Sequence, residues 1–470
     1  MKTERIMKTV MRVEGEASVG VIFPSGMLGA GFTAASVERG IEMGATAIAI
    51  DGGSTDSGPH YLGADASKSD ASAVERDLRI LLVACRDAGI PLIVGSCGTA
   101  GTDAGVDWIA GIALRIADAE RLSFCLARIY SEVAPEVVVE AIAQRRVRGL
   151  PPLGALRADT ARSCRHIVAL MGHDPIVAAL DAGAEVVLAG RATDTALVAA
   201  VALRAGLPPG PAWHAAKTVE CGGQCTTNPR AGGVFVRIDR VGFTVAPLDP
   251  DAACTPQSVA AHMLYENADP FHLVEPTGTL DTSAATYTAI DDRAVRVEGS
   301  RFVASSRPTA KLEGARLAGY ETLSLVGIRD PEILGQLDVW TGSLRGVIED
   351  RVRATLGLEP YEYQLALRFY GADAVLGPLE RAVGPVREVG LLFKVLAVDQ
   401  ATATAIAKTA NPYLLHLPPP GMDHLPSFAF ATSPAEVERG PSYEFVLNHV
   451  IEMDTSTELF RSKLTEVRSV

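Results

Sequence analysis

The chain has 470 residues, enough for two or three domains, and carries a formal net charge of −13. An acidic chain without a basic segment repels phosphate backbones, so we expect no nucleic acid partner. No uncharged apolar run reaches the roughly 18 residues of a membrane span, and residues 1–15 lack the apolar core of a secretory signal. We therefore expect no membrane partner and no secretion.

Apolar runs and polar segments alternate over the first 210 residues. The apolar runs predict strands at residues 19–23, 45–50, 90–94, 124–129 and 185–189. Helices are predicted after the cap Thr33, after the capping box Ser72–Glu75, near Asp103, and over residues 137–142, 160–171, 175–182 and 194–206. Strands joined through helices pair in parallel. We expect an α/β domain over residues 1–230, with a parallel sheet and helices on both faces.

The pattern changes after residue 230. A strand at 234–238, a helix at 257–266 and a hairpin at 287–302 predict a mixed α+β second domain over residues 231–345. A small α+β third domain is predicted over residues 346–470. Its elements are strands at 363–370, 389–398, 428–431 and 443–451, and a helix at 400–410.

Polar, glycine-rich loops follow several of the predicted strands, where parallel sheets bind their ligands. The first loop, Asp51–Tyr61, holds three glycines, three serine or threonine hydroxyl groups and two carboxylates. Glycine turns direct N–H groups at anions, and a desolvated carboxylate transfers protons. The alternative is a solvated turn. We predict catalytic roles for Asp51, Asp56, Ser54 and Thr55, and substrate binding by Ser57 and Tyr61.

Two further loops, Gly95–Asp103 and Gly190–Asp194, precede predicted helices, whose N-termini favour negative charge. Arg191 can hold a carboxylate or phosphate through two hydrogen bonds. A nucleophilic Cys97 and a structural Arg191–Asp194 ion pair are open alternatives. The predicted substrate-binding residues are Ser96, Cys97, Gly98, Thr99, Asp103, Arg191, Thr193 and Asp194, together with Glu220 in a later glycine-rich turn.

Cofactor motifs are weak in this sequence. Gly29–Ala34 matches GxGxxA, but the turn does not directly follow the strand, so NAD(P) is a weak alternative and we predict no cofactor. The seven cysteines show no disulfide spacing, which indicates reduced thiols in a cytoplasmic protein. Cys221 and Cys225 lack a second Cys/His pair, so we expect buried thiols and no metal. Lys311, Glu313 and Arg316 alternate in charge near a strand and are expected on a solvated face.

Several segments taken together resemble the acyclic terpene utilisation protein A (AtuA) family. They are residues 25–29, 51–63 (DGGSTDSGPHYLG), 189–194, 219–222, 264–270 and 311–315. The resemblance runs over nearly the whole chain. It implies the family's fold, a site at these loops and a small ferredoxin-like domain at the C-terminal end, but no particular reaction.

Carboxylates beside anion-binding loops predict an enzyme. We expect a cofactor-independent lyase (hydratase or dehydratase) or isomerase that acts on a small carboxylic acid or its acyl thioester in catabolism. In this hypothesis Asp51 or Asp56 is the proton-transfer base and Arg191 holds the anionic metabolite. A Ser- or Cys-dependent hydrolase or acyl transferase and a non-catalytic metabolite-binding or assembly subunit are the alternatives. The apolar composition is compatible with a homo-oligomer.

Overall fold

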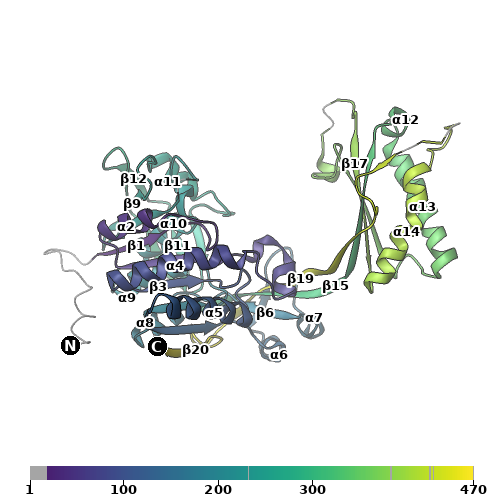
Figure 1. Cartoon of the computed structure of the whole chain (residues 1–470). Coiled ribbons are helices and arrows are strands. Elements are labelled where there is room, and N and C mark those ends of the chain that lie inside the picture. Colours follow the sequence, from purple (N-terminus) through teal and green to yellow (C-terminus); the bar gives the residue numbers. More distant parts are fainter. Residues whose placement is uncertain (1–17, 231, 382–383, 423–424, 427, 469–470) are drawn as a thin grey trace. The chain divides into compact units, whose positions relative to one another are not determined.

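The computed structural model describes residues 18–230, 232–381, 384–422, 425–426 and 428–468. The expectation about a secretory signal concerns residues outside these ranges. The chain forms two compact units, Met1–Arg316 with Phe445–Val470, and Leu317–Glu444 (Figure 1). Among the described helices, none combines the length and apolar character needed to cross a membrane.

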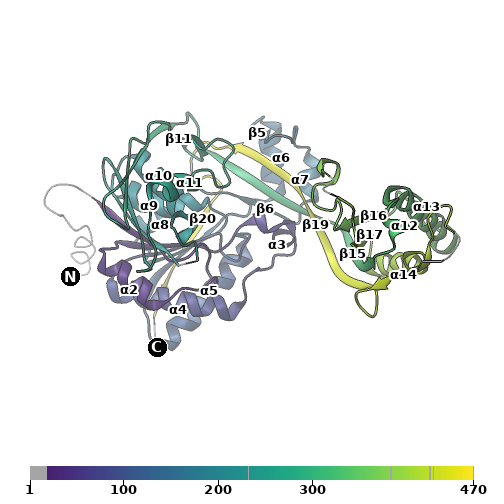
Figure 2. The same ribbon diagram turned by 90° about the horizontal axis from the view of Figure 1, so that it is seen from above.

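A ten-stranded mixed sheet forms the centre of the first unit and lies between two groups of helices (Figure 2). Its strand order is β12-β13-β9-β8-β1-β2-β3-β7-β4-β20. Its parallel strands are β1 (Val19–Phe23), β2 (Ala47–Asp51), β3 (Leu92–Gly95), β4 (Phe124–Tyr130) and β7 (Val186–Ala189). Its antiparallel strands are β8 (Val234–Ile238), β9 (Gly242–Pro247), β12 (Thr286–Ala289), β13 (Val295–Glu298) and β20 (Arg461–Val467). The five parallel strands correspond to the five predicted ones. Strands β8, β12 and β13, which the sequence suggests for a second domain, extend the same sheet together with β9, which the sequence does not predict.

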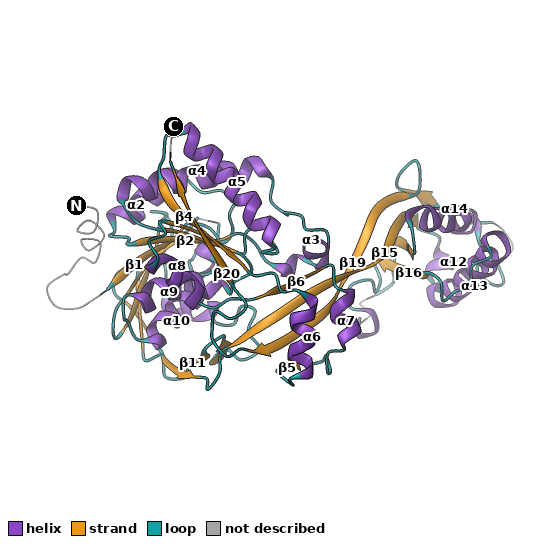
Figure 3. Ribbon diagram, turned by 90° about the horizontal axis from the view of Figure 1, so that it is seen from below, coloured by secondary structure: helices purple, strands orange, loops and turns teal. Residues whose placement is uncertain are grey.

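Helices cover both faces of this sheet (Figure 3). On one face, α2 (Ala34–Glu42), α4 (Ala71–Ala88) and α5 (Asp103–Ala119) share a core with strand residues such as Ile22 and Ile48. On the other face, α8 (Asp174–Asp181), α9 (Asp194–Arg204) and α10 (Pro209–Val219) share a core with Val21 and Ala49. Because side chains alternate along a strand, a strand that is apolar throughout can be buried on both faces.

The rest of the first unit consists of shorter elements. They are α3 (Pro59–Gly63), α6 (Pro135–Ala143), β5 (Val147–Gly149), α7 (Ala158–Ser163), β6 (His166–Ala169), α11 (Pro256–His262), β10 (His272–Glu275), β11 (Gly278–Asp281) and β14 (Arg301–Ala304), with the 3-10 turns η1 (Thr55–Ser57) and η2 (Gly222–Cys225). Strands β10, β11 and β14 form a separate antiparallel sheet. Residues 312–315 of the long strand β15 (Thr309–Ile328) pair with β6.

Three local predictions are wrong. Asp70 caps α4 in place of Ser72, because its carboxylate accepts a hydrogen bond from the Ser72 N–H at 2.9 Å. The helix predicted over 160–171 stops with α7, because the apolar residues after it pair with β15 as strand β6. The hairpin predicted over 287–302 contains only β12 and β13, since Phe302 lies in β14 and pairs with β11.

The second unit is a sheet packed against helices. It contains residues 317–328 of β15, then α12 (Pro331–Leu334), α13 (Leu337–Leu356), β16 (Gln364–Tyr370), η3 (Gly377–Leu379), β17 (Val389–Ala397), α14 (Gln400–His416), β18 (Ala429–Phe430) and the first part of β19 (Val437–Glu452). Strand β17 pairs antiparallel with both β15 and β16. Trp340, Phe393 and Ile406 meet in one core, which joins α13, β17 and α14. The long strand β15 and the helices α10 and α13 lie outside the elements that the sequence predicts.

Candidate active site

The three polar loops meet at one edge of the sheet, as expected from the parallel strand order. Asp51 lies opposite Gly95 in the β2–β3 register, and the Gly52 N–H donates to the Gly95 carbonyl at 2.7 Å. Main-chain hydrogen bonds also join Ser96 to Gly190 at 3.0 Å and Arg191 to Gly101 at 3.1 Å. Main-chain hydrogen bonds therefore join three loops that lie far apart in the sequence.

Arg191 lies where the three loops meet and is 5% exposed. Its guanidinium donates to Glu313 at 3.1 Å, to the Ser96 hydroxyl at 3.2 Å and to the Thr55 hydroxyl at 3.1 Å. Thr55 in turn donates to Glu313 at 2.7 Å. Three of the five guanidinium N–H groups are thus engaged within the protein. This arrangement favours a structural ion pair of Arg191 over binding of a ligand, although the partner is Glu313 and not Asp194.

Glu313 is buried, so its expected place on a solvated face is wrong. It comes from β15, and Lys311 of the same strand forms a second ion pair with it at 2.7 Å. Burial acts to raise the pKa of Glu313, but Arg191 and Lys311 outweigh burial and lower it to about 2. The alternating charges in the sequence could not identify this residue, because the pairing of β15 with β6 decides which side chains point inward.

Asp51 and Asp194 form an acidic pair beside Arg191. Asp51 is 4% exposed; its Oδ2 accepts the Gly53 N–H at 3.0 Å, and its buried Oδ1 has no hydrogen-bond partner among the described residues. Burial and the charge of Asp194 raise the pKa of Asp51, against the effect of Arg191. Burial also raises the pKa of the partly exposed Asp194, to about 6. A carboxyl group with a pKa of about 6, as in Asp194, exchanges protons readily near neutral pH.

A second group of buried charges adjoins Asp194. Lys217, in the last turn of α10, forms an ion pair with Glu220, and Glu275 of β10 accepts a hydrogen bond from Thr195 at 3.0 Å. Burial raises the pKa values of Glu220 and Glu275 to about 8 each. The sequence prediction includes Glu220 but misses Lys217 and Glu275. The sequence contains one indication of this ion pair: Lys217 and Glu220 are three residues apart, a spacing that places side chains next to each other on a helix.

The remaining predicted residues of the first loop are less buried than Asp51 and Thr55. The Ser54 hydroxyl donates to Asp56 at 2.7 Å, and Ser57 accepts a hydrogen bond from Lys68 at 3.1 Å. Asp56 and Ser57 are exposed, and Tyr61 is partly buried. The Asp56 charge nevertheless acts on Asp194 and raises its pKa.

The second and third loops are almost entirely buried. Cys97 is fully buried, and burial raises its thiol pKa, which disfavours a thiolate nucleophile. Thr99 accepts the Lys68 N–H at 2.9 Å, and Gly98 lies against Gly105. Thr193 accepts a hydrogen bond from Thr195 at 3.0 Å and precedes α9.

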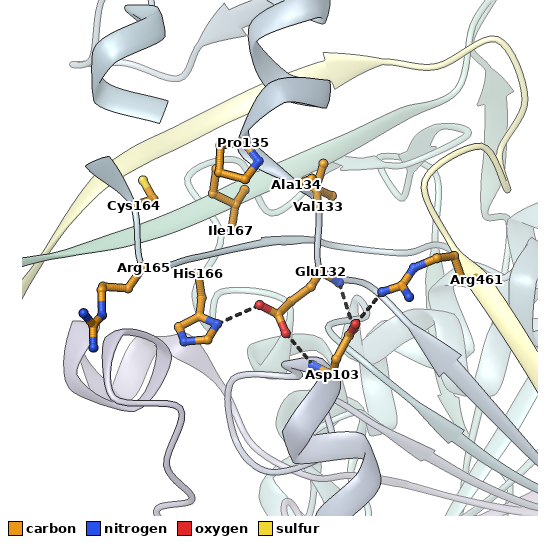
Figure 4. A pocket seen from close by; sticks show the side chains of 10 residues that line it. All are labelled: Asp103, Glu132, Val133, Ala134, Pro135, Cys164, Arg165, His166, Ile167 and Arg461. Carbon is orange, nitrogen blue, oxygen red and sulfur yellow. Dashed lines mark hydrogen bonds and ion pairs between the residues drawn. The ribbon is translucent and has the colours of Figure 1, made fainter. Parts of the chain in front are cut away.

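Asp103 belongs to a different polar cluster (Figure 4). It exchanges hydrogen bonds with Glu132, which contacts His166 at 2.7 Å, and it forms an ion pair with Arg461 of β20. These side chains line a pocket of about 240 Å³. The sequence prediction grouped Asp103 with the other loop residues because it missed the strand that supplies Arg461.

Replacing Glu132 with glutamine is expected to lower the pKa of His166, because the hydrogen bond that His166 donates to the Glu132 carboxylate is the main cause that raises it. The pKa of His166 is higher in the folded chain than in the unfolded chain, so protonation of His166 stabilises the fold below pH 6.5. This contribution is lost as the pH rises through the pKa of the folded state. The pKa of Glu132 is lowered because the His166 hydrogen bond and other contacts outweigh burial, so its contribution is present above pH 4.5 and lost in acid. Urea unfolding should therefore show the largest loss of stability in Glu132→Gln between pH 4.5 and 6.5.

NMR titration of the imidazole measures the pKa of His166 directly. Glu136→Gln, which removes a 70% exposed partner of Arg162, is the matched control and should leave the His166 pKa unchanged. An unaltered His166 pKa in Glu132→Gln would contradict the assignment of this pair.

The glycine turn after β1 has an internal partner. The N–H groups of Gly29 and Gly31 both donate to the Asp77 carboxylate, at 2.9 and 3.0 Å. In a dinucleotide-binding turn these groups face a pyrophosphate. The GxGxxA pattern here serves to bind a carboxylate of α4.

A family model for the acyclic terpene utilisation family protein AtuA matches residues 63–439. The chain belongs to the AtuA family. The matched AtuA region includes Arg191, Asp194, Lys217, Glu220 and Glu313, while Asp51 precedes it. No curated protein and no solved structure matches the chain.

Proposed function

We propose that this AtuA family member is an enzyme that transfers a proton on a small carboxylic acid or its acyl thioester, as a hydratase, dehydratase or isomerase. One observation supports this function: Asp51 and Asp194 lie beside a fixed arginine, and both carboxyl groups have raised pKa values. Paired carboxyl groups with values moved toward neutrality suit general acid–base catalysis.

The two carboxyl groups have different parts in this proposal. Asp194 is partly exposed at the start of α9 and exchanges a proton with the substrate. Asp51 acts electrostatically with Asp194, so the pair favours a state in which one of the two carboxyl groups is protonated. Arg191 is a positioning residue, since Glu313, Ser96 and Thr55 hold it. Asp194 thus replaces Asp56 as the second acid–base group, because Asp56 is exposed and bonded to Ser54.

Deuterium exchange tests this function. The full chain is incubated in D₂O with a panel of di- and tricarboxylates and acyl-CoA thioesters, and ¹H NMR follows loss of the C–H signal next to the carbonyl. Asp51→Asn and Asp194→Asn should each reduce the exchange rate by about 10²–10⁴-fold, the usual contribution of a general acid or base. Thermal unfolding confirms that both variants fold.

Asp159→Asn is the matched control, because Asp159 also lies in the first turn of a helix but its side chain is 81% exposed. It should exchange at the wild-type rate. Full exchange activity in folded Asp51→Asn and Asp194→Asn would contradict the assignment. A ligand that raises the unfolding temperature but undergoes no exchange or turnover would favour the non-catalytic metabolite-binding subunit.

We also propose that the unit Leu317–Glu444 is a ferredoxin-like domain. Support comes from its β-α-β-β-α-β element order and from the strand order β16-β17-β15-β19. The cytoplasmic location, the homo-oligomer and the absence of a cofactor stay predictions.

A further inference from the structure

We propose that Glu220, Cys221 and His262 form a binding site for a borderline-soft divalent cation such as Zn²⁺. A carboxylate oxygen, the cysteine sulfur and a histidine ring nitrogen lie within 4.8 Å of one another. Oxygen, sulfur and nitrogen donors of this kind are the ligands of protein zinc sites. The site goes beyond the proposed acid–base function and does not depend on it.

Two helix ends bring these donors together. Glu220 and Cys221 follow α10, while His262 is the last residue of α11. The Ser258 hydroxyl of α11 donates to the Cys225 carbonyl of η2 at 2.8 Å, which ties the two segments. The Thr227 N–H bonds to the Ala253 carbonyl at 2.8 Å, in the segment that precedes α11. The donor set is therefore held by the fold on both sides.

His262 supplies an independent indication of a ligand. It is 5% exposed, and its buried Nε2 has no hydrogen-bond partner among the described residues. Tyr265 stacks on the ring at a centroid distance of 5.7 Å and 14° between planes, which fixes its orientation. A buried ring nitrogen without a partner is costly, and coordination to a cation satisfies it.

The surrounding charges favour a cation. Lys217 pairs with Oε1 of Glu220, which leaves Oε2 outside that ion pair. Asp194 and Glu266 act electrostatically on both Glu220 and Cys221, and only Lys217 opposes them among the main charges. A divalent cation reduces this repulsion among acidic groups.

The geometry fits three protein ligands with a further position for water or substrate. Donors around a tetrahedral Zn²⁺ are separated by about 3.3–3.8 Å, given metal–ligand distances of about 2.0–2.3 Å. The donor atoms of the three residues lie within 4.8 Å of one another, so side-chain movements of at most about 1.5 Å would bring them to the separations found around Zn²⁺. This proposal departs from the sequence expectation of no metal and of Cys221 as an ordinary thiol.

Metal titration of the purified full chain tests the site. After dialysis against a chelator, Zn²⁺ alone is added and binding is measured by calorimetry, with one equivalent expected. Cys221→Ser and His262→Gln should each weaken binding by at least about 10-fold, since loss of even a supporting residue costs about 10–100-fold. Co²⁺ in the wild-type chain should produce a thiolate-to-cobalt charge-transfer absorption.

Two substitutions serve as matched controls. Cys125→Ser alters a partly buried thiol away from the site, and His272→Gln alters an exposed imidazole; both should bind Zn²⁺ as the wild type does. The proposal is overturned if Zn²⁺ does not bind, if folded Cys221→Ser binds it unchanged, or if the wild-type Co²⁺ complex lacks the thiolate absorption. The cobalt spectrum needs no variant, so it decides even if a substitution prevents folding.

Discussion

Replacing Arg191 with glutamine is expected to lower the free energy of unfolding of the first unit by about 3–5 kcal/mol, the usual cost of removing one partner of a buried ion pair. The variant leaves the 5% exposed Glu313 with Lys311 as its remaining ion-pair partner, and removes a positive charge that acts on Asp51 and Asp194. Urea unfolding followed by tryptophan fluorescence measures the loss, since Trp108 and Trp213 lie in this unit.

Arg204→Gln is the matched control for this prediction. Arg204 forms an ion pair with Asp181 at 2.7 Å, but the two side chains are 37% and 61% exposed. Exposed pairs contribute about 0–1 kcal/mol. The single variants Arg191→Gln and Glu313→Gln each lose unfolding free energy, and in the double variant these two losses should not add, because both residues belong to one hydrogen-bond network. Equal effects of Arg191→Gln and Arg204→Gln would refute the central role of Arg191.

Replacing Gly101 with alanine is expected to separate the second and third loops and to reduce deuterium exchange together with stability. A Cβ at this position would lie 2.2 Å from the Arg191 nitrogen and 2.5 Å from its Cα. Both atoms belong to the main chain, so no rotation of a side chain relieves the contact. The φ of +67° adds about 1–2 kcal/mol of backbone strain for any residue with a Cβ.

Gly183→Ala is the control that separates the effect of backbone strain from the effect of the close contact with Arg191. Gly183 has a φ of +94°, and a Cβ there would meet nothing within 4 Å. It should therefore show the backbone strain alone, with a modest fall in the unfolding temperature and a normal exchange rate. If Gly101→Ala is no more destabilised than Gly183→Ala, the close packing of Gly101 on Arg191 is not required for the fold.

The loops of the site were predictable from sequence because they follow apolar strands. A run such as residues 47–50 is apolar at every position, which indicates a strand buried on both faces, and the polar Asp51 then marks its carboxyl end. Parallel pairing through helical crossovers places all such ends on one edge. The position of Asp51, Ser96 and Arg191 followed from this local pattern.

Partners from distant strands could not be predicted in the same way. Glu313 reaches Arg191 only because β15 pairs with β6, and Arg461 reaches Asp103 only because β20 pairs with β4. Pairings over such separations depend on the closure of long loops and leave no periodic pattern near the residues concerned. His262 and Cys221 approach each other through the packing of two helix ends for the same reason.

The sequence by itself determined the five parallel strands, most of the helices around them and the edge of the sheet at which polar loops gather. Hydrophobic periodicity, caps and glycines act over a few residues, so these features can be inferred locally. Only the tertiary structure decided which side chains at that edge are buried together, and therefore which carboxyl groups have raised pKa values. Desolvation and the charges of neighbours depend on three-dimensional packing, which places Asp194 beside Asp51 and Lys217 and leaves Asp56 in solvent.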